Sequence, residues 1–481
     1  MKHPAIIAGG GPVGLMLALE LARAGLKAVV LEQRPGHYDD LRVGTFHARL
    51  VEIFGERGML DELGAPNRWP GVHFGMIWLD LSKLDTEYNL LVSQTEIERV
   101  LERHAVGLGA DVRWGHTVTG FSQDDAGVRV QISSPDGDYE LEGEYLVGCD
   151  GPNSTVRKLA DIPLTVAGKS WYGLLGDFAS YDGEFDAGVV QGGVFGMLPS
   201  GDGPWRLQTL QFDVEAPPDS QPPTREELLG SLERITGKST GEVGEMLWVR
   251  RYTGTTQLAD SFRAGRVFLA GEAAHFYVPT ASHGLNTALT DALNLAWKLA
   301  AAVGGWAPPE LLDSYHRERH LAGYRACQLS QAQMALMHPL DKVTALREVF
   351  QELVDIEEVN RRLATWATDI EYPFPGRGAG GGLVGHRLGH LPLDILDGTA
   401  KNTGDLMGSP RGVFLDLSEG DRFAHLSAWK HRLDVVRARP TADLDVPALL
   451  VRPDGYVAWA GDDEKRLATA LHTWFGDPRT T

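Results

Sequence analysis

The chain has 481 residues, with 65 Asp and Glu against 45 Lys and Arg, so its net charge at pH 7 is −20. A single hydrophobic core seldom grows to this length, and we therefore expect two or three domains in a soluble, globular protein. The negative charge disfavours nucleic acid and anionic membranes as partners, because both would repel the surface. The sequence has no run of ~20 apolar residues that could span a bilayer.

The two cysteines, Cys149 and Cys327, lie far apart and lack the spacing of metal ligands. The sequence therefore predicts neither a disulfide framework nor a metal site. The N-terminus begins with Lys2 and apolar residues, but glycines, Glu20 and Arg23 interrupt the run, which is unlike a signal peptide. These features fit the reducing cytoplasm, where we expect the protein to act.

The first 32 residues have the pattern of a strand, a glycine-rich turn, a helix and a second strand. The turn is a GxGxxG motif whose relevant residues are Gly9, Gly11, Pro12, Val13 and Gly14. This arrangement is the fingerprint of a dinucleotide-binding βαβ unit, in which the helix N-terminus faces the pyrophosphate. Glu32 follows Gly14 by 18 residues, where an acid accepts hydrogen bonds from a ribose and repels a 2′-phosphate. The predicted ligand is FAD or NAD, not NADP.

Polar residues beyond Glu32 offer further contacts to such a ligand. Gln33 and Arg34 follow the second strand directly, and Arg42 and Arg49 are candidate pyrophosphate partners, because a guanidinium matches phosphate oxygens. The alternative for Arg42 and Arg49 is a place on a solvated helix face, and this alternative has more weight for Arg49 than for Arg42. Gln94 precedes a predicted helix, where it either meets a polar ligand or serves as a cap.

Two more apolar strands end in a glycine next to an acid. The first ends at Asp150-Gly151 and the second at Gly271-Glu272, each at a strand's carboxyl end, where α/β sheets bind ligands. After the second strand come Pro279, Gly284, Leu285 and Asn286, which lead into a long helix whose N-terminus can stabilise an anion. His275 and His283 are possible general bases, but we favour a packed turn residue for His275 and a loop residue near the cofactor for His283.

The rest of the chain separates into an inserted sheet, a helical region and a tail. Aromatic-rich strands within 171–262 predict a mostly antiparallel sheet, and 309–368 is helical. A glycine-rich segment over 372–382 then leads to a tail of strands, a Pro453-Asp454-Gly455 hairpin turn and a final helix. We assign three domains. The FAD-binding domain consists of residues 1–70, 95–170 and 263–372, and the substrate-binding domain consists of residues 71–94 and 171–262. The C-terminal domain consists of residues 383–481.

These motifs, in this order and spacing, make the chain resemble the group A flavoprotein aromatic hydroxylases, which are single-component FAD-dependent monooxygenases. It is most similar to the aromatic polyketide hydroxylases of actinobacterial antibiotic pathways, over nearly its whole length. The motifs that carry the resemblance are the GxGxxG turn, Asp150-Gly151 with Arg157 following, and Gly271-Glu272-Ala273-Ala274-His275 with Pro279 and Gly284-Leu285-Asn286.

The resemblance implies a Rossmann-like FAD-binding domain, an inserted mostly antiparallel β substrate domain and a C-terminal thioredoxin-like domain lacking CxxC. It also implies a resident FAD, with NADPH or NADH as a transient co-substrate. Glu32 would bind the adenosine ribose, Arg42 the pyrophosphate, Gln94 the ribityl region, and Leu285-Asn286 the flavin pyrimidine edge. The full set of predicted cofactor-binding residues is Gly9, Gly11, Pro12, Val13, Gly14, Glu32, Gln33, Arg34, Arg42, Gln94, Asp150, Gly151, Gly271, Glu272, Pro279, Gly284, Leu285 and Asn286.

Two positions depart from the family pattern. Glu272 stands where the family has an aspartate, and its extra methylene alters the reach toward the ribityl chain. His283 lies in a loop where relatives commonly have small and amide residues, and it would change the polarity at the flavin edge.

The implied reaction is hydroxylation of a polycyclic aromatic, polyketide-type substrate by NAD(P)H and O2 through a flavin C4a-hydroperoxide. No residue is required as a proton-transfer base, and Pro279 and Asn286 would form the flavin and peroxide environment. Substrate contacts are expected from Phe74, Trp78, Phe195, Met197, Gln208 and Gln211. The protein would be a monomer or a homodimer.

Other functions remain open. Within enzymes, the alternatives are Baeyer-Villiger-type oxygen insertion and antibiotic-inactivating hydroxylation of the rifampicin monooxygenase kind. A flavin halogenase is disfavoured because the sequence has no Trp-x-Trp-x-Ile-Pro segment. A flavin-bound regulatory or assembly protein is the alternative from another class.

Overall fold

The computed structural model describes residues 2–37, 43–63, 67–69, 71–81, 89–183, 186–199, 204–215, 217–218, 221–239, 242–278, 283–368, 382–395, 402–418, 422–439 and 446–478. Arg42 and Pro279, two predicted cofactor contacts, lie outside these residues. None of the described helices is long and apolar enough to cross a membrane. Within the same ranges, no group of three or more His, Cys, Asp or Glu is placed to hold a metal ion.

A six-stranded sheet forms the centre of the N-terminal half, in the order β18-β19-β12-β1-β2-β8, and only the outer β18 pairs antiparallel. Its strands are β1 (Ile6–Ala8), β2 (Val29–Glu32), β8 (Asp111–Trp114), β12 (Leu146–Gly148), β18 (Arg263–Ala264) and β19 (Val267–Leu269). The strands β1, β12 and β19 are fully buried, as expected for a parallel sheet covered on both faces. The carboxyl ends of these strands therefore meet at one edge, beside the GxGxxG turn.

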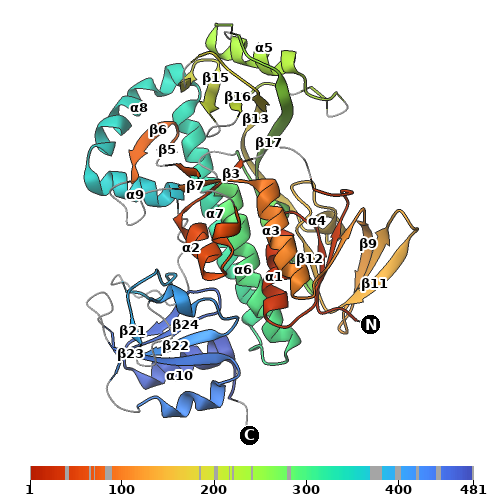
Figure 1. Cartoon of the computed structure of the whole chain (residues 1–481), viewed down its shortest axis with the longest axis vertical. Helices are drawn as coiled ribbons and strands as arrows, with labels where there is room; N and C mark the ends of the chain where they lie inside the picture. The colour runs from red at the N-terminus through yellow and green to blue at the C-terminus, as the bar shows by residue number, and fades with distance from the viewer. Residues whose placement is uncertain are drawn as a thin grey trace.

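Helices cover this sheet, and the longest run through the middle of the molecule (Figure 1). They are α1 (Pro12–Arg23), α3 (Gln94–Gly107), α4 (Thr155–Leu159), α6 (His283–Val303) and α7 (Leu311–Met337). The helix α1 packs between α3 and α6, and Ser93 caps α3 by accepting a hydrogen bond from the backbone N–H of Glu96. The predicted strand–helix–strand start is confirmed. A second, three-stranded sheet of β9 (Thr117–Gln123), β10 (Val128–Ser133) and β11 (Tyr139–Gly143) flanks the first.

The inserted sheet lies at the upper end of the molecule in Figure 1, where its strands have the order β14-β15-β16-β13-β17-β20 and every pair is antiparallel. Its elements are β13 (Leu164–Phe178), β14 (Asp186–Val190), β15 (Gly193–Pro199), β16 (Trp205–Phe212), β17 (Met246–Ala259), β20 (His275–Phe276) and the covering helix α5 (Arg225–Thr236). The predicted antiparallel sheet is confirmed. The short β20 follows η3 (Gly271–Ala273), so the sheet is joined directly to the predicted flavin site.

Short strands, three α-helices and one 3-10 helix complete this half of the chain. These are β3 (Val43–Phe46), α2 (Ala48–Glu56), η1 (Leu60–Leu63), β4 (Asn67–Trp69), β5 (Gly71–Phe74), β6 (Ile77–Asp80), β7 (Asn89–Ser93), α8 (Leu340–Val354) and α9 (Glu357–Thr368). The β5–β6 hairpin packs against α9 and α8 and makes no sheet with β13. The domain boundaries given from the sequence stay a prediction.

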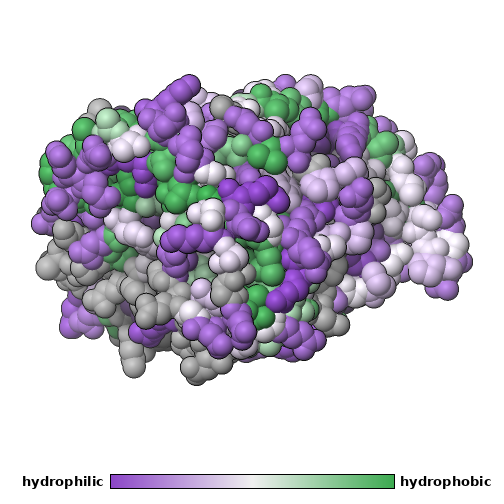
Figure 2. Space-filling view, turned by 90° about the horizontal axis from the view of Figure 1, so that it is seen from above, coloured by the Kyte–Doolittle hydropathy of each residue, from purple (hydrophilic) through white to green (hydrophobic). Residues whose placement is uncertain are grey.

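Helix α8 exposes Leu346, Val349 and Leu353, and hydrophobic patches interrupt a mainly hydrophilic surface in Figure 2.

The C-terminal domain is a five-stranded mixed sheet with the order β21-β23-β22-β24-β25 and a final helix. Its elements are β21 (Asp394–Ile395), η4 (Gly404–Leu406), β22 (Gly412–Asp416), η5 (Ala424–Trp429), β23 (Leu433–Arg439), β24 (Ala448–Val451), β25 (Val457–Ala460) and α10 (Glu464–Phe475). The β22–β23 pair is parallel, whereas β24 and β25 add an antiparallel hairpin through the predicted turn. This arrangement is compatible with the predicted thioredoxin-like fold.

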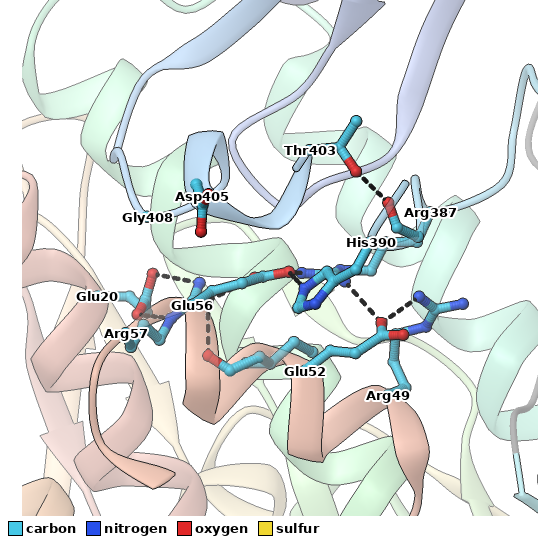
Figure 3. Close-up of polar contacts among 12 residues, drawn as sticks. Glu20, Arg49, Glu52, Glu56, Arg57, Arg387, His390, Thr403, Asp405 and Gly408 are labelled. Carbon is cyan, nitrogen blue, oxygen red and sulfur yellow. Dashed lines mark hydrogen bonds and ion pairs between the residues drawn. The ribbon is translucent and has the colours of Figure 1, made fainter. Parts of the chain in front are cut away.

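Two buried groups of charges hold the C-terminal domain against the FAD-binding half. In the first (Figure 3), the buried carboxylate of Glu56 in α2 accepts hydrogen bonds from Arg387 Nη2 at 2.6 Å and from His390 Nε2 at 3.1 Å. Burial would raise the pKa of Glu56, but His390 and Arg387 lower it to about 2. In the second, Arg452 binds Glu318 of α7 through two nitrogens at 2.9 and 3.0 Å.

Candidate active site

The β1–α1 turn leaves space for a ligand at one glycine and closes tightly at two others. A Cβ on Gly9, whose φ is +106°, would lie 2.3 Å from the carbonyl oxygen of Cys149. A Cβ on Gly14 would lie 1.9 Å from the carbonyl oxygen of Gly9. At Gly11, no heavy atom of the described residues comes within 4 Å of a Cβ, so the backbone is open on that side. This geometry fits a pyrophosphate that approaches Gly11 at the N-terminus of α1.

Glu32 is buried beside this turn and is already held by backbone groups. Its Oε2 accepts a hydrogen bond from the N–H of Gly10 at 2.6 Å, and its Oε1 accepts one from the N–H of Arg34 at 2.9 Å. A carboxylate so fixed still has lone pairs for a ribose hydroxyl. The position of Glu32 at the end of β2 therefore suits the role predicted for it.

Arg34 and Gln94 converge on one buried acid, Glu98 of α3. The Nη1 of Arg34 lies 3.3 Å from Glu98 Oε2, and Gln94 Nε2 donates to Glu98 Oε1 at 3.1 Å. The Arg34 guanidinium also lies 5.5 Å from the ring centre of Trp114. These contacts orient Arg34 and Gln94 from behind, which keeps two half-buried polar groups near the predicted adenosine and ribityl regions.

Asp150 is used mainly to hold the backbone that follows it. Its carboxylate accepts hydrogen bonds from the hydroxyl of Ser154 at 2.5 Å and from the N–H groups of Thr155 and Val156 at 2.7 and 3.1 Å. Gly151 takes the left-handed region at φ +79°, which turns the chain into α4. Asp150 therefore shapes the strand end, and a contact to the cofactor from this residue stays a prediction.

The Gly271-Glu272 turn depends on a buried aspartate of α6 that the sequence did not single out. Asp291 accepts hydrogen bonds from the Gly271 N–H at 3.0 Å, His275 Nε2 at 2.7 Å and Arg319 Nε at 2.6 Å. Burial raises the pKa of Asp291, but Arg319 and His275 outweigh it and leave the pKa below its usual value. His275 is packed, as expected, and Glu272 is exposed at the surface of the turn.

Asn286 joins the N-terminal end of α6 to β3. Its Nδ2 donates to the carbonyl of Thr45 at 2.8 Å, and its Oδ1 accepts from the N–H of His47 at 3.0 Å. Leu285 packs over Gly44, where a Cβ would lie 2.6 Å from Leu285 Cδ2. The side chain of Asn286 thus fixes β3 against α6, while Gly284 leaves the helix end open. Contact of this helix end with the flavin edge stays a prediction.

His283 was expected in a loop, and the structure corrects this expectation. It is the first residue of α6 and only 2% exposed, because it packs between His47 and the end of α9. Nothing in the sequence indicated a helix before Gly284. The histidine is therefore part of the helix start, not of a solvent-facing loop.

The expected substrate residues of the inserted sheet lie on opposite faces. Phe195, Met197 and Gln211 are on the face that α5 covers, where Ser231 of α5 donates to Gln211 Oε1 at 3.2 Å. Gln208 lies on the other face, since residues three apart in a strand point in opposite directions. Of these four residues, the structure leaves only Gln208 directed toward the FAD-binding half.

The two remaining expectations lie on the β5–β6 hairpin. Phe74 is buried and stacks on Phe350 of α8 with 6.4 Å between ring centres. Trp78 is 42% exposed and contacts His73 edge to face. Phe74 serves the packing of the hairpin against α8, and a contact of Phe74 or Trp78 with the substrate stays a prediction.

The face of the sheet that meets the FAD-binding half carries aromatic residues that the sequence analysis missed. Trp171 is buried there with Phe212 and Val278, and Tyr252 lies 5.7 Å from the Trp171 ring centre. The indole N–H of Trp171 has no hydrogen-bond partner among the described residues. A two-residue period counted from Gln208 would have reached Leu210 and Phe212, but only the register of the sheet adds the residues of β13 and β17.

The structure thus defines a nucleotide-binding enzyme with a dinucleotide turn, two further strand ends beside it and an aromatic face opposite. Residues 2–330 match a family described as an FAD binding domain, and residues 381–478 match the C-terminal domain of aromatic-ring hydroxylases. The chain belongs to this family of FAD-binding aromatic-ring hydroxylases. It is a FAD-dependent monooxygenase with NAD(P)H as its co-substrate, as the resemblance implied.

Three relatives illustrate the range of this family. A dialkyldecalin synthase from Streptomyces rugosporus is 40% identical over 99% of both chains. A rifampicin monooxygenase from Streptomyces venezuelae is 37% identical over 98% of both chains. The solved structure of the OxyS anhydrotetracycline hydroxylase from Streptomyces rimosus is 37% identical, with a TM-score of 0.90 over 100% of each chain.

Proposed function

We propose that the enzyme hydroxylates a polycyclic phenolic compound of the aromatic polyketide type, bound between the inserted sheet and the flavin. The observation that carries this proposal is the aromatic face around Trp171 and Tyr252, which meets the FAD-binding half beside the Gly271 turn. Flat aromatic rings pack well against such a surface. The free indole N–H and the amide of Gln208 add hydrogen-bonding groups for a phenol or carbonyl oxygen.

In this proposal FAD is held by the β1–α1 turn, by Glu32 and by the start of α6. When bound, it accepts a hydride from NADPH, less favourably from NADH, and activates dioxygen. The protein keeps water away from the reacting groups, because Trp171, Val278 and Met334 pack into one buried cluster there. The N-terminus of α6 places partial positive charge at the flavin edge.

The decisive experiment uses the purified, FAD-loaded protein with NADPH and a panel of polycyclic phenols. We expect at least one phenol to accelerate NADPH oxidation and oxygen uptake and to yield a product that has gained one oxygen atom. Product NMR then separates ring hydroxylation from oxygen insertion beside a ketone. If no phenol accelerates flavin reduction, the proposal fails.

A second candidate function is ring formation without oxidation. The 40% identity to a dialkyldecalin synthase over 99% of both chains is the observation that favours it. Such a reaction consumes neither NADPH nor oxygen, and substrate and product have the same mass. A linear polyene incubated with the enzyme under anaerobic conditions would therefore distinguish the two candidates.

A further inference from the structure

A small cavity lies at the buried start of α6, on the side of His283. Its volume is about 30 Å³, more than the ~10–15 Å³ that one water molecule needs. Its lining comes from the start of α2, from α6 and α7, from the end of α9 and from the C-terminal domain, and it includes His47, Arg49, His283, Thr287, Arg319 and Tyr456.

Two residues of this cavity, His283 and Thr287, have polar side-chain atoms whose hydrogen bonds are not accounted for among the described residues, and His283 is the one with an ionisable side chain. Its side chain is 2% exposed and lies against the backbone of Ala367, but neither ring nitrogen makes a hydrogen bond of good geometry with the described residues. Leaving two polar atoms of a buried ring unbonded is costly, so native structures fill such positions with water or a ligand. The cavity beside the ring has the size for one water.

The cavity reaches both the start of α6 and the C-terminal domain. Of the residues that line it, His283 and Arg319 are both 2% exposed, whereas Tyr456 and Arg49 are half-buried. Tyr456 belongs to the C-terminal domain, so the cavity lies at the boundary between domains. A polar route therefore leads from this boundary to the helix end at which we place the flavin.

The proposed reaction needs such a route. Oxidation of NADPH to NADP+ with hydroxylation of one C–H bond consumes one O2 and one proton, and the second oxygen atom leaves as water. The proton comes from solution in every turnover, yet the site is enclosed by the inserted sheet and α6.

We propose that His283 and one water in this cavity form a proton relay from the domain boundary at Tyr456 to the flavin-binding end of α6. His283 accepts a proton from the water at one ring nitrogen and releases the proton of the other nitrogen toward the cofactor. The ring is neutral before and after the transfer, and exchange between its two tautomers restores the starting state. This inference rests on the proposed function, and it gives the C-terminal domain a part in the site.

The surroundings of His283 favour a neutral imidazole that passes protons on over an imidazolium that keeps one. Burial lowers the pKa of His283 to about 3, and His47 and His73 add to this effect, while the backbone of Ala367 acts in the opposite direction. The neutral imidazole is therefore the form of His283 at pH 7.

The test is the rate of proton uptake when reduced methyl viologen, which releases no proton on oxidation, reduces the bound flavin without oxygen, followed with an indicator dye in a rapid-mixing instrument. His283→Gln keeps a hydrogen-bonding side chain but cannot pass a proton between two nitrogens. We expect it to bind FAD like the wild type and to take up protons about a hundredfold more slowly, the lower end of what a positioned proton-transfer group contributes. Tyr456→Phe should slow uptake to a lesser extent.

His104→Gln is the matched control, because His104 bonds to Glu62 on the surface of α3, far along the chain from this cavity. A crystal structure of the FAD-loaded enzyme should show an ordered water bonded to His283. Wild-type uptake rates in both His283→Gln and Tyr456→Phe, or a cavity without water, would overturn the relay. The measurement needs neither substrate nor NADPH, so it stands even if no phenol is hydroxylated.

Discussion

The β1–α1 turn and the inserted sheet build their parts of the site in different ways. In the turn, the contacts of Gly14 with Gly9 and of Glu32 with Gly10 lie within the first 32 residues, at the spacing of the βαβ motif. In the sheet, the contacts that define the aromatic face join distant strands, such as Trp171 with Gly254. The turn therefore depends on the absence of single side-chain atoms, whereas the sheet depends on which face each residue occupies.

The largest effect is expected from Gly14→Ala, which tests the turn. The new Cβ would lie 1.9 Å from the carbonyl oxygen of Gly9, so helix and strand must separate. We expect purified protein with almost no FAD, measured as flavin absorbance per protein. Gly36→Ala is the control, because no heavy atom of the described residues lies within 4 Å of its added Cβ. Normal FAD content in Gly14→Ala would show that close packing at this turn is not required.

Glu32→Ala removes the carboxylate that anchors both Gly10 and Arg34. We expect the Kd for FAD to rise by about 10- to 100-fold, since hydrogen bonds to a charged group contribute ~1.5–3 kcal/mol. Titration of the apoprotein with FAD, followed by flavin fluorescence, measures this change. Glu32→Gln retains one acceptor oxygen and should lie between wild type and Glu32→Ala. An unchanged Kd in Glu32→Ala would remove this residue from the cofactor site.

The contrast between the two regions also explains what the sequence could reveal. The glycines at positions 9 and 14 and the acid at position 32 are required by local backbone geometry, so their spacing alone predicted the turn. Asp291 acts on Gly271 across 20 positions, and nothing in its own surroundings marks it as an acceptor for that backbone. The burial of His283 could not be predicted from the sequence, because it depends on packing of the start of α6 against α9.

The sheet shows the same limit more clearly. The aromatic strands of the insertion were predicted, and their antiparallel pairing is confirmed. The inward face could not be assigned, because a shift of one residue exchanges the two faces, and the register of β15 and β16 is set by pairing with each other and with β14 and β13. Phe195, Met197 and Gln211 were expected at the substrate for this reason, and they lie under α5.

A paired comparison of the two faces tests this correction. Tyr252→Ala removes an aromatic ring from the inner face and should raise KM for the aromatic substrate about tenfold, equal to ~1.4 kcal/mol. Met197→Ala opens a space under α5 and should leave KM unchanged while lowering stability by ~2–5 kcal/mol. Steady-state kinetics and thermal unfolding of FAD-loaded protein measure both. A raised KM in Met197→Ala alone would place the substrate on the α5 face.

The smallest effect, a change in thermal stability, is expected from a substitution at the His390–Glu56 pair, where contacts between the domains reach the surface. The hydrogen bond to Glu56 raises the pKa of His390 above 6.5, with burial opposing it. Protonated His390 is favoured by folding, so its contribution is complete below pH 6.5 and is lost as the pH rises through the raised pKa. Glu56, with a pKa of about 2, stays ionised throughout this range.

His390→Gln should therefore lower the Tm slightly near pH 6 and have no effect at pH 9. The expected difference is below ~1 kcal/mol, because the His390 side chain is 35% exposed and solvent screens the pair. Thermal unfolding of both proteins between pH 5.5 and 9, at low and high salt, measures it. A difference that grows with pH would show that the two domains are held at this point by packing and not by the charge of His390.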